Sequence, residues 1–297
     1  MLQKLLRAPA LLGRAWMALS YAMAHDCMGI EFDLFGRRLG WSMLAQGRRS
    51  GWQYVLNPVS VPRYFEFEFA AACLPACPSK CLDVSSPRLF SLYVARRNPQ
   101  VSILMLNPDR GDIALSSTIH TALNLSNIHT AALDVRALAS SPDTYDCIWS
   151  ISVVEHIAGE YDDRDAVRHM YAALKPGGRL ILTIPVDRTA WDEYRDADYY
   201  GLQSPQPRPQ QYFFQRFYDE ASLQERLLNP IGRKPTVVRW LGETTAGHFA
   251  DYIQRWLRDG INCTVDDPRE MVDHYREYGS WASMPGMGIC GLMIQKD

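Results

Sequence analysis

The sequence has little of several features that mark particular protein classes. Its 31 Lys and Arg nearly balance its 33 Asp and Glu, which gives a formal net charge of −2. Such a chain carries no strong field that would attract nucleic acid or an anionic membrane. It also contains no segment near the ~20 consecutive apolar residues that a membrane span needs. We therefore expect neither a nucleic-acid partner nor a membrane partner.

Cysteine is sparse as well. Seven residues form an odd, scattered set in a chain of 297 residues, which favours a reduced, cytoplasmic protein without a disulfide framework. Cys73, Cys77 and Cys81 are evenly spaced, but Pro75 and Pro78 interrupt the run. The spacing does not match a zinc site, so we expect no metal there and interpret Cys81 as a buried strand residue.

The N-terminus imitates a signal peptide, because Lys4 and Arg7 precede an apolar segment. Arg14 breaks that segment, however, and its apolar residues recur at helical spacing. This pattern favours an amphipathic helix that packs on the protein over a secreted leader. We expect residues 1–75 to form a mainly helical accessory or lid region, and residues 76–297 to form the main domain.

One stretch, Lys80–Asn107, organises the rest of the chain. Cys81–Val84 reads as a buried strand, and Ser85-Ser86-Pro87 reads as a turn into a helix over Arg88–Arg97. A second apolar strand follows over Val101–Leu106. This is a βαβ unit, and ligands of open α/β sheets bind outside the carboxyl ends of such strands.

Strands and helices continue to alternate after this unit. Helices are predicted over Asp112–Leu125, Asp163–Leu174, Asp219–Leu228, Phe249–Leu257 and Pro268–Tyr278, and strands over Ile128–Leu133, Cys147–Ser152, Arg179–Pro185, Thr236–Leu241 and Gly288–Ile294. The cadence indicates an α/β fold with a mostly parallel sheet.

Two segments do not fit the alternation. Residues 187–217 are rich in proline and aromatic residues, and their place after a strand's carboxyl end suits a substrate cover. Arg63–Phe69 alternates aromatic and acidic residues, so a strand and a helix both remain open. We favour a packing element there over a lid that brings Tyr64 to a ligand, because aromatic residues usually pack.

Two motifs carry a resemblance to a known family. Tyr145–Ile157 (YDCIWSISVVEHI) and Leu174–Leu182 (LKPGGRLIL) resemble the fourth-strand segment and the turn before the fifth strand of class I S-adenosylmethionine-dependent methyltransferases. Leu82–Val84 resembles the start of the family's first motif. The resemblance spans about residues 80–240. It implies a Rossmann-like, seven-stranded, mostly parallel sheet with helices on both faces and an antiparallel last strand. It also implies S-adenosylmethionine as cofactor and a small-molecule acceptor.

The resemblance places a set of cofactor contacts on the ends of the first four strands. The residues that it implies are Asp83, Ser85, Ser86, Met105, Asn107, Asp134, Val135, Ser150 and Ile151. Asp83 has a structural alternative, in which its carboxylate only ties down the N–H groups of the following turn. Asp134, expected to meet the adenine amino group, has the alternative of a cap before Arg136.

The sequence departs from the family pattern twice. No glycine occurs between Lys80 and Arg110, although the family's first motif is rich in glycine so that backbone can approach the cofactor. Met105 stands where the family has an acid that binds the ribose hydroxyls. Asn107 or Asp109 would replace that acid by a small shift, since an amide oxygen also accepts a hydroxyl proton.

Four residues are candidates for the chemistry itself. Glu155 and His156 offer acid–base groups, because His titrates near neutrality. We favour the alternative, a structural pair that closes the turn after the strand. Tyr64 and Tyr194 bring hydroxyls that would orient a nucleophile.

Three functions remain open at this point. The first is methyl transfer to a small molecule, which needs little beyond in-line positioning of a nucleophile. The second is a lyase or cyclase on the same fold that closes the methionine part of the cofactor and releases methylthioadenosine. The third is a non-enzymatic binding protein, which the missing glycines and ribose acid would suit. The sequence predicts no oligomeric state.

Overall fold

The computed structural model describes residues 2–199, 201 and 204–297. The chain divides into two compact units. Unit 1 contains Met1–Glu68, Leu241–Tyr278 and Ser283–Met287, and unit 2 contains Phe69–Trp240, Gly279–Ala282 and Gly288–Asp297. The predicted ranges 1–75 and 76–297 differ from these units, since a C-terminal segment belongs to unit 1 with the N-terminal helices.

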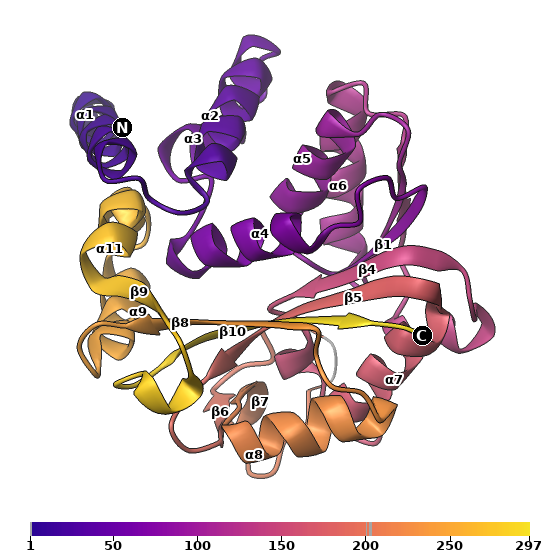
Figure 1. The fold of residues 1–297 in the computed structure, drawn as a ribbon. Coiled ribbons are helices and arrows are strands. Elements are labelled where there is room, and N and C mark those ends of the chain that lie inside the picture. The colour runs from indigo at the N-terminus through magenta and orange to yellow at the C-terminus, as the bar shows by residue number, and fades with distance from the viewer. Residues whose placement is uncertain (1, 200, 202–203) are drawn as a thin grey trace. The chain divides into compact units, whose positions relative to one another are not determined.

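The main sheet has eight strands where the family resemblance implies seven. They are β1 (Lys80–Val84), β2 (Ser102–Leu106), β3 (Ile128–Ala131), β4 (Tyr145–Ile151), β5 (Leu174–Val186), β8 (Val237–Glu243), β9 (Tyr275–Tyr278) and β10 (Gly288–Gln295). Their order is β3-β2-β1-β4-β5-β10-β8-β9 (Figure 1). Strands β1 to β5 pair in parallel, and β10 is antiparallel to β5, as expected for the last strand.

The eighth strand arises where the sequence predicts a helix. The predicted helix over Pro268–Tyr278 ends early, as α11 (Asp267–His274), and Tyr275–Tyr278 continues as β9. Local pattern cannot anticipate this, because strand pairing depends on a tertiary partner.

Helices cover both faces of the unit 2 sheet. They include α5 (Leu89–Arg97), α6 (Arg110–Ala122), α7 (Asp163–Ala173) and α8 (Glu220–Leu223), with the short turns η1 (Val135–Ser140), η2 (Val154–His156), η3 (Gln224–Leu228) and η4 (Asn229–Ile231). Figure 1 shows α5 and α6 on one side of the sheet and α7 and α8 on the other. Helix α7 begins at a capping box in which Asp162 and Asp165 satisfy N–H groups of the first turn.

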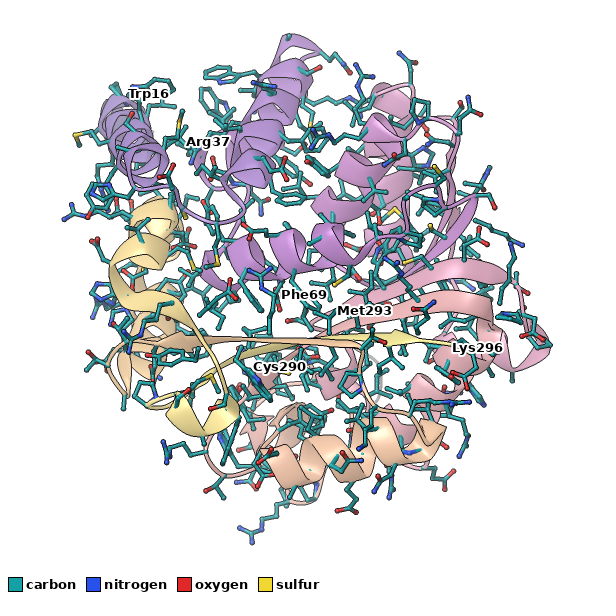
Figure 2. The ribbon with its side chains drawn as sticks, in the orientation of Figure 1. Trp16, Arg37, Phe69, Cys290, Met293 and Lys296 are labelled. Carbon is teal, nitrogen blue, oxygen red and sulfur yellow. The ribbon has the colours of Figure 1, made fainter. Side chains whose placement is uncertain are left out.

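The core of unit 2 is the apolar face between these layers. Cys81, Trp149 and Ile181 on neighbouring strands are fully buried. Gly291 on β10 faces the Phe69 ring so closely that an added Cβ would lie 2.7 Å from it. Figure 2 labels Phe69 beside the β10 residues Cys290 and Met293.

The insertion at 187–217 contains a hairpin that the sequence does not reveal as one. Strands β6 (Trp191–Arg195) and β7 (Tyr212–Phe217) form a separate antiparallel sheet. The fully buried Asp163 of α7 anchors its end, because Arg216 donates to this carboxylate at 3.0 Å and the Tyr218 hydroxyl at 2.7 Å. The insertion is therefore fixed to the body of unit 2 by ionic hydrogen bonds.

Unit 1 is mainly helical. It contains α1 (Leu2–Ala24), α2 (Ile30–Ala45), α3 (Gly51–Leu56), the start of α4 (Val61–Cys73), α9 (His248–Asp259), α10 (Ile261–Thr264) and α11. The short turn η5 (Trp281–Ser283) has two residues in unit 2 and one in unit 1. The predicted N-terminal helix is thus present, and the ambiguous Arg63–Phe69 segment is helical. Within the described part of the chain, every helix is too short or too polar to cross a membrane.

Candidate functional site

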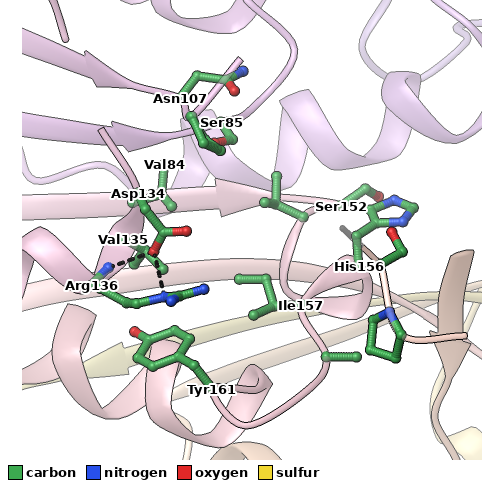
Figure 3. A pocket seen from close by; sticks show the side chains of 15 residues that line it. Val84, Ser85, Asn107, Asp134, Val135, Arg136, Ser152, His156, Ile157 and Tyr161 are labelled. Atoms are coloured by element: carbon green, nitrogen blue, oxygen red, sulfur yellow. Dashed lines mark hydrogen bonds and ion pairs between the residues drawn. The ribbon is translucent and has the colours of Figure 1, made fainter. Parts of the chain in front are cut away.

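A cavity of about 220 Å³ opens at the carboxyl ends of β1, β2 and β4 (Figure 3). It lies entirely within unit 2. Its lining residues are Val84, Ser85, Asn107, Pro108, Asp134, Val135, Arg136, Ser152, Val153, His156, Ile157, Ala158, Tyr161, Ser204 and Pro205. The parallel strands bring these loops to one edge, which is where a ligand of an open α/β sheet binds.

The loop after β1 takes the shape of a glycine turn without glycine. Ser85 has φ +56°, in the left-handed region that glycine adopts most easily. Its N–H donates to the Leu106 carbonyl at 2.8 Å, and its hydroxyl donates to the same oxygen at 3.1 Å. The hydroxyl is thus held at the end of β2, and the loop keeps its turn although it carries a side chain.

Ser86 and Asp83 support this loop from beneath. The buried Ser86 hydroxyl accepts from the Ile151 N–H at 3.0 Å, which joins the loop to the end of β4. The Asp83 carboxylate accepts from the Ser86 N–H at 2.8 Å and from the Ser91 hydroxyl. These are the bonds of the structural alternative for Asp83. Neither Ser86 nor Asp83 is among the residues that line the cavity.

The Asp83 carboxyl is wholly buried at the base of the loop. Burial raises the pKa of Asp83 to about 6, because a charged carboxylate loses its hydration, while the hydrogen bonds from Ser91 and Ser86 oppose this rise. Ionisation of Asp83 at neutral pH therefore lowers the free energy of unfolding.

At the end of β2, the structure brings Asn107 and not Met105 to the cavity. Met105 pairs with Asp83 across the two strands and is 5% exposed. Asn107 follows the strand and lines the cavity. Its Oδ1 accepts from the Asp109 N–H at 2.9 Å, and its amide donates to Asp112 at 3.2 Å. Asp109 itself caps α6 by accepting from Gly111, so the side chain of Asn107 is fixed in place.

The loop after β3 supplies a carboxylate and a cation. Asp134 caps η1 by accepting from the Arg136 N–H at 2.8 Å, and it also lines the cavity beside Val135. The Arg136 guanidinium lies 3.3 Å from the same carboxylate and 5.0 Å from the centre of the Tyr161 ring. Capping and ligand contact are compatible here, because one carboxylate accepts several hydrogen bonds.

The end of β4 turns sharply into the cavity wall. Ser150 and Ile151 are fully buried and do not line the cavity. Ser152 does line it, with φ +48°, and its N–H donates to the Thr183 carbonyl at 3.0 Å. The backbone of β4 therefore reaches the cavity one residue later than the sequence predicts.

His156 brings an imidazole to the cavity in a defined orientation. Its Nδ1 lies 2.6 Å from the Phe214 carbonyl oxygen of β7. A carbonyl only accepts, so Nδ1 carries the proton of this bond and the neutral ring keeps its lone pair on Nε2. Nε2 lies 4.0 Å from Oε1 of the buried Glu155. His156 can therefore act as a base, and the carboxylate of Glu155 lies beside the imidazolium that forms when His156 takes a proton.

Two predicted catalytic tyrosines lie elsewhere. The Tyr64 hydroxyl is buried in unit 1, where it donates to Asp33 at 2.6 Å, and burial with this negative neighbour raises the pKa of Tyr64. Tyr194 lies on β6 with its ring edge-on to Phe213 at 6.1 Å. Neither is a lining residue. The insertion contributes Ser204 and Pro205 to the wall instead.

Sequence reasoning missed Arg136 and Tyr161 as lining residues. Arg136 directly follows the predicted contacts Asp134 and Val135, so its position was the available signal. Tyr161 comes from the loop before α7, and its hydroxyl bonds His169 at 3.0 Å. No motif marks it, because a tertiary turn alone brings it to the cavity.

The family comparison agrees with this architecture. Residues 89–180, from α5 into β5, match a family model described as a methyltransferase domain. No curated protein matches the sequence significantly.

Solved structures share the fold at low identity. Coclaurine N-methyltransferase bound to N-methylheliamine and S-adenosylhomocysteine is 12% identical, with 77% of this chain and 68% of that chain covered and a TM-score of 0.51. The MccD protein is 10% identical, with 80% and 99% covered and a TM-score of 0.52. Geranyl diphosphate methyltransferase in complex with S-adenosylmethionine is 11% identical, with 79% and 86% covered and a TM-score of 0.50. The match over residues 89–180 and the shared fold support the class I S-adenosylmethionine-dependent methyltransferase superfamily.

Proposed function

We propose that the cavity binds S-adenosylmethionine and that the enzyme moves its methyl group to a small-molecule acceptor. The observation that carries the proposal is the meeting of Asn107, Asp134 and His156 in one cavity at the carboxyl ends of parallel strands. The coclaurine and geranyl diphosphate enzymes, which share the fold, are both methyltransferases by name.

The donor set suits each part of this cofactor. Asp134 offers carboxylate oxygens to an adenine amino group, and Val84, Val135 and Ile157 offer apolar surface to its ring. Asn107 offers an amide oxygen to a ribose hydroxyl. Ser85, which lines the cavity at the end of β1, would face the methionine part. We assign cofactor contact to these lining residues, and a supporting role to Asp83, Ser86, Met105, Ser150 and Ile151, which lie behind them.

When bound, the cofactor supplies an electrophilic methyl group on a sulfonium. The chain's own contribution is positioning and proton removal. His156 Nε2 would accept the acceptor's proton, and Glu155 would stabilise the resulting imidazolium 4.0 Å away. The carbonyl of Phe214 holds the ring in this tautomer. Tyr64 and Tyr194 are left without a role at this cavity.

Calorimetric titration with S-adenosylhomocysteine tests the binding step. We expect one site with an affinity in the micromolar range or tighter, and a loss of about tenfold in Asp134→Ala, because a hydrogen bond to a charged group contributes roughly 1.5 kcal/mol. A wild-type protein that gives no binding heat under any buffer, and shows no protection from thermal unfolding, would remove the proposal.

Incubation with S-adenosylmethionine alone separates the two reaction classes. Methyl transfer predicts no turnover until a hydroxyl- or amine-bearing acceptor is added, and then release of S-adenosylhomocysteine. Release of methylthioadenosine without an acceptor would instead show a lyase or cyclase. The matched control is the His156→Ala variant, in which acceptor-dependent turnover should fall while cofactor binding remains.

A further inference from the structure

Unit 1 holds a second cluster of ionisable side chains, apart from the cavity residues of unit 2. We propose that His248, Glu270 and His274 form a binding site for one divalent transition-metal ion, with Zn²⁺ as the ion that their chemistry suits. One ligand atom from each residue lies within 4.8 Å of the other two. This inference does not depend on the function proposed above.

Two helices present the three ligands. His248 is the first residue of α9, while Glu270 and His274 are four residues apart on α11. Residues with this spacing lie on the same face of a helix, one turn apart. The His248 and His274 rings are stacked, with centroids 3.9 Å apart and an angle of 24° between their planes. The three side chains therefore lie together, and the stacked rings would have to turn for a nitrogen of each to face one ion.

The start of α9 is held firmly by a buried carboxylate. Glu243 is 1% exposed and accepts hydrogen bonds from the N–H groups of Gly247 at 2.9 Å, Phe249 at 2.8 Å and Met287 at 3.1 Å. Two of these bonds come from the residues on either side of His248 in the sequence. Gly247 also supplies the φ of +90° that the turn needs. The backbone that carries His248 is thus fixed before any metal binds.

Two further bonds lock α11 to the same frame. The Tyr252 hydroxyl of α9 donates to the buried Asp267 of α11 at 2.8 Å. The Thr244 N–H, directly after β8, donates to the carbonyl of His274 at 2.8 Å. A site whose supporting shell is already bonded loses little entropy when it takes an ion.

The charge on Glu270 suits a cation. Arg255 lies 2.8 Å from Oε1, and His248 Nε2 bonds the same oxygen. Among the described residues, none donates a hydrogen bond to Oε2. An ion would bind that oxygen and replace the His248 contact, while Arg255 keeps orienting the carboxylate.

Two imidazoles and a carboxylate are a known zinc donor set that leaves a fourth position for water. Ligands at about 2.0–2.2 Å from Zn²⁺ lie roughly 3.4 Å apart. Ligand atoms up to 4.8 Å apart would therefore have to approach one another by up to about 1.4 Å when an ion binds. All three residues are partly exposed, which gives the ion a path of entry. The competing interpretation is an ion pair of His248 and Glu270 with a stacked His274, which needs no metal.

Calorimetry on the full chain, freed of metal by chelation and titrated with ZnCl₂, separates these interpretations. We expect one Zn²⁺ per chain, with affinity reduced at least tenfold in each of Glu270→Gln, His248→Gln and His274→Gln. His129→Gln and Cys77→Ser are matched controls at an exposed imidazole and an exposed thiol in unit 2, and they should bind as the wild type does.

Co²⁺ provides a second readout on the wild-type protein alone. Visible absorption bands of four- or five-coordinate Co²⁺, removed by one equivalent of Zn²⁺, are expected. Circular dichroism verifies that each variant folds. If a variant does not fold, the Co²⁺ spectrum of the wild-type protein still tests for the metal site. Wild-type protein that binds no Zn²⁺ at 100 μM, or binds it equally well in folded variants, would overturn the proposal.

Discussion

The loops after β1 and β4 begin alike and end differently. Ser85 and Ser152 both adopt positive φ, of 56° and 48°, directly beyond their strands, and both line the cavity. The first loop then turns its polar groups inward, to Leu106, Ile151 and Asp83. The second presents the ring of His156 to the cavity.

This difference separates scaffold from chemistry within one site. The β1 loop is rigid, because hydrogen bonds join its two serines to the buried Asp83 carboxylate and to the ends of β2 and β4. The β4 loop carries a group that can exchange a proton, and β7 holds that group in place from the insertion. Changes in the first loop should therefore alter stability, and changes in the second should alter turnover.

The largest expected effect is on the β4 loop. We expect His156→Ala to lower kcat by about 10²–10⁴-fold, because the variant loses its general base. The kcat is measured with an acceptor that the wild-type enzyme turns over. Unfolding free energy and S-adenosylhomocysteine affinity should change little. Steady-state kinetics over a range of pH measures this, and an unchanged kcat with an unchanged pH profile would give His156 a structural role only.

Asp83 should produce the next effect, on stability alone. The pKa of Asp83 in the folded protein, about 6, lies above the ordinary aspartate value of 3.8. Between these two pH values the folded state therefore binds more protons than the unfolded state. The stabilising contribution of Asp83 is complete below about pH 4 and is lost as pH rises through 6, by on the order of 3 kcal/mol.

Denaturant unfolding of the wild type and Asp83→Asn at pH 4 and pH 7 measures this contribution. The asparagine keeps acceptor and donor groups for Ser86 and Ser91 but does not titrate. The wild type should lose stability relative to the variant as pH rises. Parallel pH curves for the two proteins would contradict the assignment.

A smaller effect distinguishes Asn107 from its neighbour Asp109. We expect Asn107→Ala to weaken S-adenosylhomocysteine binding by about five- to tenfold, since roughly 1 kcal/mol of hydrogen bonding is lost. Asp109→Ala removes only the cap of α6, which costs about 1 kcal/mol of stability. Equal affinities in the two variants would show that the ribose does not rely on Asn107.

The smallest effect concerns the turn itself. Ser85→Gly relieves a strained φ but loses the bond to the Leu106 carbonyl, so the free energy of unfolding should change by less than about 1 kcal/mol. Ser85→Ala keeps the strain and loses the same bond, so it should be the less stable of the two. Thermal unfolding of both variants provides the comparison, and the reverse order would contradict the strain argument.

Much of this fold follows from local pattern. The βαβ unit over residues 80–107 and the helix from Asp163 could be predicted, because buried strands, caps and proline stops are encoded in short segments. Asn107, Asp134 and His156 line the cavity, and each comes after a predicted strand, although the sequence favoured a structural role for His156. The resemblance to the methyltransferase superfamily rests on the motifs at Tyr145–Ile157 and Leu174–Leu182.

The rest depends on distant partners. Residues 275–278 read as helix but pair as β9, and Arg63–Phe69 alternates like a strand but forms part of α4. The hairpin β6–β7 depends on the buried anchor at Asp163, and Tyr161 reaches the cavity only through the turn before α7. The His248, Glu270 and His274 cluster joins two helices that no local pattern brings together.

A crystal structure grown with saturating S-adenosylhomocysteine would show whether the unit 2 cavity holds the cofactor. We expect the adenine beside Asp134 and Val135, a ribose hydroxyl at Asn107, and the thioether over the Ser85 turn and facing His156. Ligand density elsewhere on the protein, or a Ser85 turn that occupies the place of the ligand, would contradict this expectation.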